Sequence, residues 1–187
     1  MSQKPCYFQN RHDWRQWLEA NFRAEKDVWL VYPHKSSGKL CISYNDAVEE
    51  ALCFGWIDSI VKKHDAESSM QRFTPRNPKS AYSQPNKERL KWLAENNLLH
   101  PEIHQNVTNI LVEEFVYPID IIAELRADEE TWQNFQKFSE PYKRIRVAYI
   151  HQARVRPDEF DKRLKNFLAK TKQNKKIIGH GGVDKYY

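Results

Sequence analysis

Charged and polar side chains lie two or four positions apart in two segments between Trp56 and Arg76. Side chains alternate between the two faces of a β-strand, so Asp58 and Lys62 would share one face of a first strand. A second strand would likewise place three residues on one face: Arg72, Thr74 and Arg76. If the two strands pair as a hairpin in the matching register, all five side chains meet on one surface.

One carboxylate among three cations leaves guanidinium donors available to a ligand. A planar guanidinium suits bidentate contact with a phosphate or a carboxylate. The following segment adds hydrogen-bonding groups near the start of a helix, where N–H groups also favour anions: Ser80, Tyr82 and Asn86. We therefore predict a pocket for a small anionic ligand, in which Asp58 orients the cations. The alternative is an exposed hairpin face with ordinary ion pairs.

Catalysis is a second possibility for these residue types. Cys53 could act as a nucleophile with His64 as its base, but Cys53 ends a predicted amphipathic helix and is better explained as a small core residue. His100 and His104 are four residues apart, yet they lack the glutamate of a metal-binding HExxH helix and a third ligand. The chain has no glycine-rich phosphate loop. We predict no catalytic residue, metal or cofactor, and an uncharacterised enzyme centred on Asp58 stays an alternative.

The positive charge of the chain belongs to its C-terminal quarter. From Phe138 onward there are 13 Lys/Arg and 5 Asp/Glu, whereas the first 137 residues carry 17 and 20. Basic residues interleaved with aromatics are typical of nucleic-acid binding, and the segment contains Tyr142, Lys143, Arg144, Arg146, Tyr149, Arg154, Arg156, Phe160, Lys162, Arg163 and Lys165. The aromatics fall at core spacing, so a solvated helix face is the favoured interpretation. Nucleic acid is the alternative partner.

The composition predicts a protein that folds without disulfide bonds. Forty per cent of the residues are hydrophobic, with six tryptophans, which is enough to build a core. The three cysteines, Cys6, Cys41 and Cys53, form no CxxC pair, so neither a disulfide framework nor a structural zinc site is expected. The first residues lack the apolar segment of a signal peptide, and no run is long enough to cross a bilayer. We expect a cytoplasmic protein and leave its oligomeric state open.

Strands early in the chain and helices later predict an α+β fold, with a small antiparallel sheet packed with helices and then a C-terminal helical module. Ser43 is expected to cap a helix that Gly55 ends, and Asp128 is expected to cap a later helix. Periodicity predicts helices at 11–24 and 44–54, strands at 27–34, 56–63 and 70–76, and helices from residue 86 onward.

Two domains follow from this pattern. We assign residues 1–115 to the α+β domain and residues 116–187 to the helical module. The last 14 residues have no helical period and three glycines, so we expect a flexible tail.

Three long motifs resemble a known family. "ALCFGWIDSIVKKHD", "RFTPRNPKSAYSQPNKERLKWL" and "FQKFSEPYKRIRVAYIHQARVRPDEFDKRLKNFLAK" are similar to the YdeI/OmdA family, whose members are described as bacteriocin-protection or OmpD-associated proteins. The family typically has Trp at the position of Tyr82, and its last module differs from "RVRPDEFDKR". The resemblance implies a role in bacterial stress or bacteriocin resistance. It implies no catalytic mechanism, and a protein partner or a small anionic ligand would both fit it.

Overall fold

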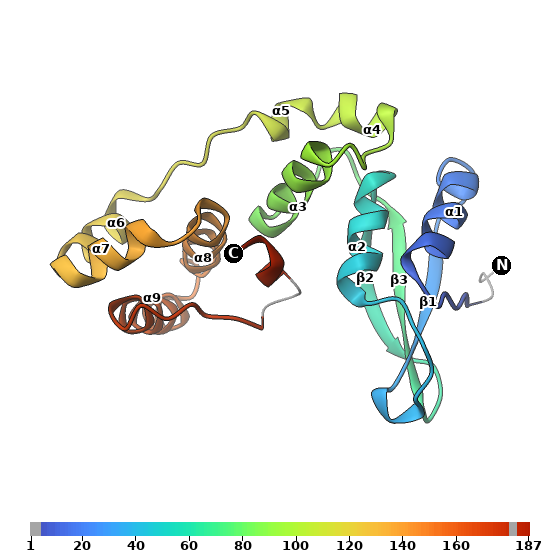
Figure 1. Ribbon diagram of the computed structural model, residues 1–187, viewed down its shortest axis with the longest axis horizontal. Helices are drawn as coiled ribbons and strands as arrows, with labels where there is room; N and C mark the ends of the chain where they lie inside the picture. The colour runs from blue at the N-terminus through green and yellow to red at the C-terminus, as the bar shows by residue number, and fades with distance from the viewer. Residues whose placement is uncertain (1–4, 180–182) are drawn as a thin grey trace. The chain divides into compact units, whose positions relative to one another are not determined.

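The computed structural model describes residues 5–179 and 183–187 (Figure 1). The chain forms two compact units. The first contains Met1–Ala81 and Arg89–Leu111, and the second contains Tyr82–Glu88 and Val112–Tyr187. Helix α3 (Gln84–Glu95) therefore begins in the second unit and ends in the first.

A three-stranded antiparallel sheet is the centre of the first unit. Its strands are β1 (Val28–Pro33), β2 (Trp56–Lys63) and β3 (Ser68–Pro75), in the order β1-β3-β2. The predicted β2–β3 hairpin is confirmed, with β3 beginning two residues earlier than expected. The α+β prediction is confirmed as well.

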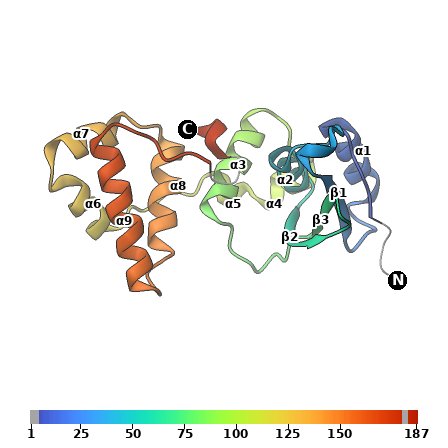
Figure 2. The ribbon, with the colours of Figure 1, turned by 90° about the horizontal axis from the view of Figure 1, so that it is seen from below.

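Helices cover one face of this sheet. Figures 1 and 2 show α1 (Arg11–Asn21) and α2 (Tyr44–Cys53) on the same side of the strands. The rest of the unit consists of a short 3-10 turn, η1 (Lys35–Ser37), the end of α3, α4 (Pro101–Asn106) and α5 (Thr108–Leu111).

The ends of α2 follow from local chemistry. The Ser43 side chain accepts a hydrogen bond from the backbone N–H of Asp46 and satisfies one free donor of the first turn. Gly55 ends the helix with φ +72°, a conformation that side chains disfavour. A Cβ atom at this position would lie 2.9 Å from Cδ1 of Ile103. The predicted cap and stop are both confirmed.

Aromatic side chains join the helices to the sheet. Trp14 is fully buried, packs edge-on against Phe73 of β3 and donates from Nε1 to the carbonyl of Ala47 at 3.0 Å. Trp56 donates to the carbonyl of Phe22 at 3.1 Å. A buried indole needs such an acceptor. These contacts fix α1 and α2 on the inner face of the sheet.

Four helices and a C-terminal turn form most of the second unit: α6 (Ile119–Arg126), α7 (Glu129–Lys137), α8 (Glu140–His151), α9 (Pro157–Lys172) and η2 (Val183–Tyr186). Their core contains Ile121, Leu125, Phe135, Phe138, Tyr142, Val147, Ile150 and Phe167. As predicted, Asp128 caps α7, accepting from the backbone N–H of Thr131 at 2.9 Å. None of the helices in the described ranges has the length and apolar character needed to cross a membrane.

The C-terminal segment packs more closely than its composition predicts. Val183 and Tyr186 are 1% and 9% exposed. The backbone N–H of Ile177 donates to the Tyr142 hydroxyl at 3.0 Å, and Arg146 donates to the carbonyl of Ile177. The expected flexible tail thus differs from the described parts of this segment, because two buried side chains of α8 bind its backbone. Residues 180–182 lie outside the described residues.

Candidate functional site

The predicted hairpin residues do not meet on one face of the sheet. Asp58 pairs with Phe73 and Lys62 pairs with Met70, with a bulge between them. An extra residue in one strand reverses which side chains share a face. Asp58 consequently lies on the helix-covered face, while Lys62 lies on the opposite face with Arg72. The expectation that Asp58 and Lys62 share a face is wrong for this reason.

Each of these side chains has its own partners. Asp58 accepts hydrogen bonds from the Tyr44 hydroxyl at 2.9 Å and from Gln71 at 2.7 Å. Burial, with Asp58 beside it, raises the pKa of Tyr44 to about 12. On the other face, Nζ of Lys62 lies 5.2 Å from the centre of the Trp29 ring.

The predicted arginines also have protein acceptors. Arg72 donates twice to Asp27, at 2.8 and 2.6 Å. Thr74 lies opposite Ile57 in the register. Arg76 donates to the carbonyls of Asn77 and Ser80.

The remaining predicted residues follow β3. Tyr82 lines a cavity of the second unit that is described below, whereas Asn86 lies in the first turns of α3. The structure therefore distributes the eight predicted positions over several environments: Asp58, Lys62, Arg72, Thr74, Arg76, Ser80, Tyr82 and Asn86. Their role in ligand binding stays a prediction.

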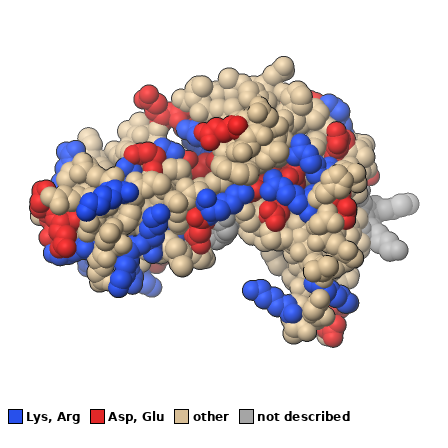
Figure 3. Space-filling model, viewed as in Figure 1, with Lys and Arg blue, Asp and Glu red and all other residues tan. Residues whose placement is uncertain are grey.

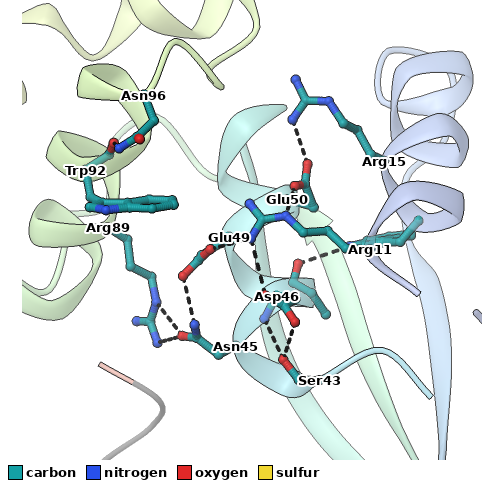
Figure 4. Close-up of polar contacts among 12 residues, drawn as sticks. Arg11, Arg15, Ser43, Asn45, Asp46, Glu49, Glu50, Arg89, Trp92 and Asn96 are labelled. Carbon is teal, nitrogen blue, oxygen red and sulfur yellow. Dashed lines mark hydrogen bonds and ion pairs between the residues drawn. The ribbon is translucent and has the colours of Figure 1, made fainter. Parts of the chain in front are cut away.

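A buried network of charges joins α1 to α2 (Figure 4). Glu49 and Glu50 are 0% and 2% exposed. Arg11 donates to both glutamates, Arg15 donates to Glu50 at 2.7 Å, and Asn45 donates to Glu49 at 2.8 Å. All four carboxylate oxygens thus accept a hydrogen bond, which is what buried charges require. We assign this network a structural role.

The second unit has a cavity of about 320 Å³ between α8, α9 and the segment after α9. Its volume lies within the range of small-molecule sites. Apolar walls come from Ile150, Phe167 and Ile177. The polar and charged lining consists of Arg146, Tyr149, Glu159, Lys162, Arg163 and Asn166.

Three cations and one carboxylate face this cavity. Arg146 is only 4% exposed, and its Nε has no hydrogen-bond partner among the described residues. Arg163 is held between Glu159, at 2.7 Å, and the carbonyl of Tyr149, at 2.8 Å. Lys162 is exposed and forms no ion pair within the described ranges. An anion in the cavity would balance the excess positive charge of its lining.

Several of the other basic residues are engaged within the second unit. Arg144 donates to both oxygens of Glu88 at 2.7 Å, and Arg154 donates to Asp120 at 2.7 Å. Tyr142, one of the interleaved aromatics, is fully buried. Figure 3 shows other Lys and Arg side chains on the surface around α9. The engaged residues favour the interpretation of a helix face over a continuous nucleic-acid surface.

The alternative catalytic residues have structural positions. Cys53 is fully buried, and burial raises the pKa of its thiol to about 12, so the thiol stays protonated near neutral pH. The predicted core role of Cys53 is confirmed. His100 caps α4 by accepting from the backbone N–H of Glu102. Within residues 5–179 and 183–187, no three His, Cys, Asp or Glu side chains are grouped to hold a metal ion.

Arg146, Lys162 and Arg163 were predicted only as possible nucleic-acid contacts, within the basic C-terminal helices. One available sign was the position of Arg146, four residues from both Tyr142 and Ile150 on the buried stripe of α8. An arginine on an apolar stripe needs a reason, because an isolated buried charge is costly. The contribution of Ile177 had no such sign, since it depends on how the chain returns after α9.

Two family models match the chain. One, described as a domain of unknown function (DUF8412), matches residues 6–106. The other, described as "Bacteriocin-protection, YdeI or OmpD-Associated", matches residues 114–174, which include most of the cavity lining. The motifs that begin at Ala51 and Arg72 thus fall within the first model and the third motif within the second. No curated protein and no solved structure matches the chain.

Proposed function

Because the chain belongs to the family of the domain of unknown function DUF8412 and carries a domain of the bacteriocin-protection, YdeI or OmpD-associated family, we propose that it is a ligand-binding protein of bacterial stress protection. The ligand is a small anion held in the cavity between α8 and α9. The excess of cations in the cavity lining, Arg146, Lys162 and Arg163 against the single carboxylate of Glu159, is the observation that carries this proposal.

The proposed roles of the lining residues follow from their contacts, exposure and charge. Arg163 is fixed by Glu159 and lies against Tyr149, with Cζ 3.6 Å from the ring centre. The Arg163 guanidinium is therefore a positive charge held in a fixed position at the cavity. Lys162 is exposed and closes over the ligand from the solvent side. The apolar walls, which include Ile150 and Phe167, favour an anion with a small apolar part over a bare inorganic ion.

Thermal unfolding in the presence of inorganic phosphate, pyrophosphate and short carboxylates tests ligand binding. A ligand present at a hundred times its Kd stabilises the folded state by about 2.7 kcal/mol, which raises the melting temperature. Lys162→Glu should remove the shift. Lys165→Glu is the matched control, because Lys165 is exposed on the same helix but does not line the cavity. No shift with any anion, or equal shifts for both variants, would refute the proposed site.

A growth assay tests the protective role. We expect expression of the chain in a bacteriocin-sensitive bacterium to raise the dose that halves growth. The Lys162→Glu variant should lose this protection while the Lys165→Glu variant keeps it. Protection that is equal in both variants would separate the cellular role from the cavity.

A further inference from the structure

An extended segment of the second unit has no partner strand. Between α5 and α6 the chain runs from residue 113 to residue 118 without helical or strand pairing. The backbone groups of Glu114, Phe115, Val116 and Tyr117 form no hydrogen bond with other described residues. Backbone groups of this kind are a template for a second extended chain.

Two aromatic side chains hold this segment in place. The rings of Phe115 and Tyr117 pack edge to face, with centres 4.8 Å apart. Tyr117 also contacts Phe135 and donates from its hydroxyl to Glu140 at 3.2 Å. The side chains of Phe115 and Tyr117 are thereby held on one face of the segment. Because side chains alternate along an extended chain, Glu114 and Val116 lie on the other face.

A second cavity adjoins the segment. It has a volume of about 420 Å³, and its lining includes Tyr82, Phe115, Val116, Pro118 and Ala148. Ala148 lies on the opposite side of α8 from Arg146, which lines the first cavity. The two cavities are therefore separate, and this inference does not depend on the proposed anion site.

Exposed apolar residues lie in and beside the same segment, and one of them, Val116, lines the second cavity. Val112, Val116 and Ile119 are 74%, 85% and 88% exposed. Three large apolar side chains within eight residues, next to an open cavity, are typical of a protein interaction surface.

The charge of the segment indicates what kind of partner fits. Residues 112–125 contain Glu113, Glu114, Asp120 and Glu124 but no basic residue. Lys87 binds Glu113 at 2.6 Å and Arg154 binds Asp120 at 2.7 Å. Glu114 has no ion pair within the described residues, so negative charge remains beside the exposed backbone.

We propose that residues 113–118 and the adjoining cavity bind an extended, basic peptide segment of a partner protein. The peptide adds as a strand to the backbone of Glu114–Tyr117. One of its apolar side chains enters the cavity, and a lysine or arginine contacts Glu114. Backbone pairing supplies affinity, and the cavity and the carboxylate supply the sequence preference.

The test uses the full chain and three labelled synthetic peptides in a fluorescence-anisotropy titration. The first peptide alternates lysine with valine, the second replaces lysine by glutamate, and the third is the first with alternate backbone nitrogens methylated. We expect binding of the first peptide only, because the second reverses the charge and the third loses the backbone donors. Equal binding of the first and second peptides, or no binding of the first, would overturn the proposal.

Two variants locate the binding site. Ala148→Trp fills the cavity and should weaken binding of the basic peptide by at least about tenfold, whereas Ala169→Trp, on an exposed position of α9, should not. Glu114→Lys should weaken binding, and Glu130→Lys on α7 is its control. If Ala148→Trp does not fold, Val116→Ser removes an exposed apolar contact without changing the core. Unchanged affinity in the folded cavity variant and in Glu114→Lys contradicts the assignment.

Discussion

Buried charge is used differently in the two units. In the first, every carboxylate oxygen of Glu49 and Glu50 accepts a hydrogen bond, from Arg11, Arg15 or Asn45. In the second, Arg146 is buried to a similar degree but leaves Nε unpartnered among the described residues. Nη2 of Arg11 in the first-unit network is likewise unpartnered among the described residues, so an unpaired donor alone does not indicate a ligand site. The two cases differ in the cavity that Arg146 lines, and the ligand is proposed for that cavity.

The largest expected effect is the loss of a network carboxylate. Glu50→Ala leaves Arg11 and Arg15 without their shared acceptor and should reduce the free energy of unfolding by about 3 kcal/mol. This figure allows for partial solvent access, since the arginine side chains are 30% and 31% exposed. Arg146→Leu should reduce the free energy of unfolding by only about 1 kcal/mol, because it removes one hydrogen bond, from Arg146 to the carbonyl of Ile177.

Urea denaturation followed by circular dichroism measures both variants. Glu95→Ala, an exposed position of α3, is the control for the loss of a glutamate side chain. If Arg146→Leu reduces the free energy of unfolding as much as Glu50→Ala does, Arg146 is a structural residue and the proposed difference between the two units is wrong.

A smaller effect is expected at the turn after α2. Gly55→Ala combines a positive φ of 72° with a Cβ atom 2.9 Å from Ile103, so we expect a loss of about 2 kcal/mol. Gly38 has a similar φ of 66°, and a Cβ atom at this position would have no other atom within 4 Å. Gly38→Ala should therefore reduce the free energy of unfolding by about 1 kcal/mol. The difference in urea midpoint between the two variants measures the packing contribution at Gly55. Equal midpoints would show that Ile103 moves aside freely.

The smallest effect concerns acid stability in the second unit. Hydrogen bonds from Lys172 and Thr131 lower the pKa of Asp128. A lowered pKa stabilises the folded state above the unfolded value of about 3.9, and this stabilisation is lost as the pH falls further. Asp128→Asn keeps a helix cap but cannot ionise. The melting temperature of the wild type should exceed that of the variant at pH 6, and the gap should narrow below about pH 4.

Melting curves of both proteins between pH 2 and pH 7 check this expectation. Asp161→Asn removes an exposed carboxylate that has no ion pair within the described residues, and its gap from the wild type should vary less with pH. If the difference in melting temperature between the wild type and Asp128→Asn does not change with pH, the ion pair between Asp128 and Lys172 contributes nothing to stability.

Prediction from sequence succeeded where the determinants lie within a few residues. Ser43 and Asp128 were identified as helix caps and Gly55 as a helix end, because each acts on backbone groups of its own turn. The prediction failed at Asp58 and Lys62. No glycine marks the bulge between Asp58 and Val61 in the sequence. The bulge depends on how β2 pairs with β3, whose residues facing the bulge lie about ten positions or more further along the chain.

The candidate site illustrates the same limit. Its cations come from α8 and α9, and the strong helical pattern of both segments was predicted. The cavity, however, exists only because the chain after α9 returns to α8 and places Ile177 against Tyr142 and Arg146. No local sequence pattern predicts that the segment after α9 packs against α8.

The sequence by itself determined the family resemblance, the α+β class, the hairpin and the ends of α2. The last three depend on hydrophobic period and short-range hydrogen bonds. Only the tertiary structure decided which charges are satisfied. Glu50, Arg146 and Asp58 are all polar residues of regular elements, and their different partners come from other segments of the chain. Burial and pairing are properties of the packed molecule, so the distinction between a structural charge and a ligand contact arises only there.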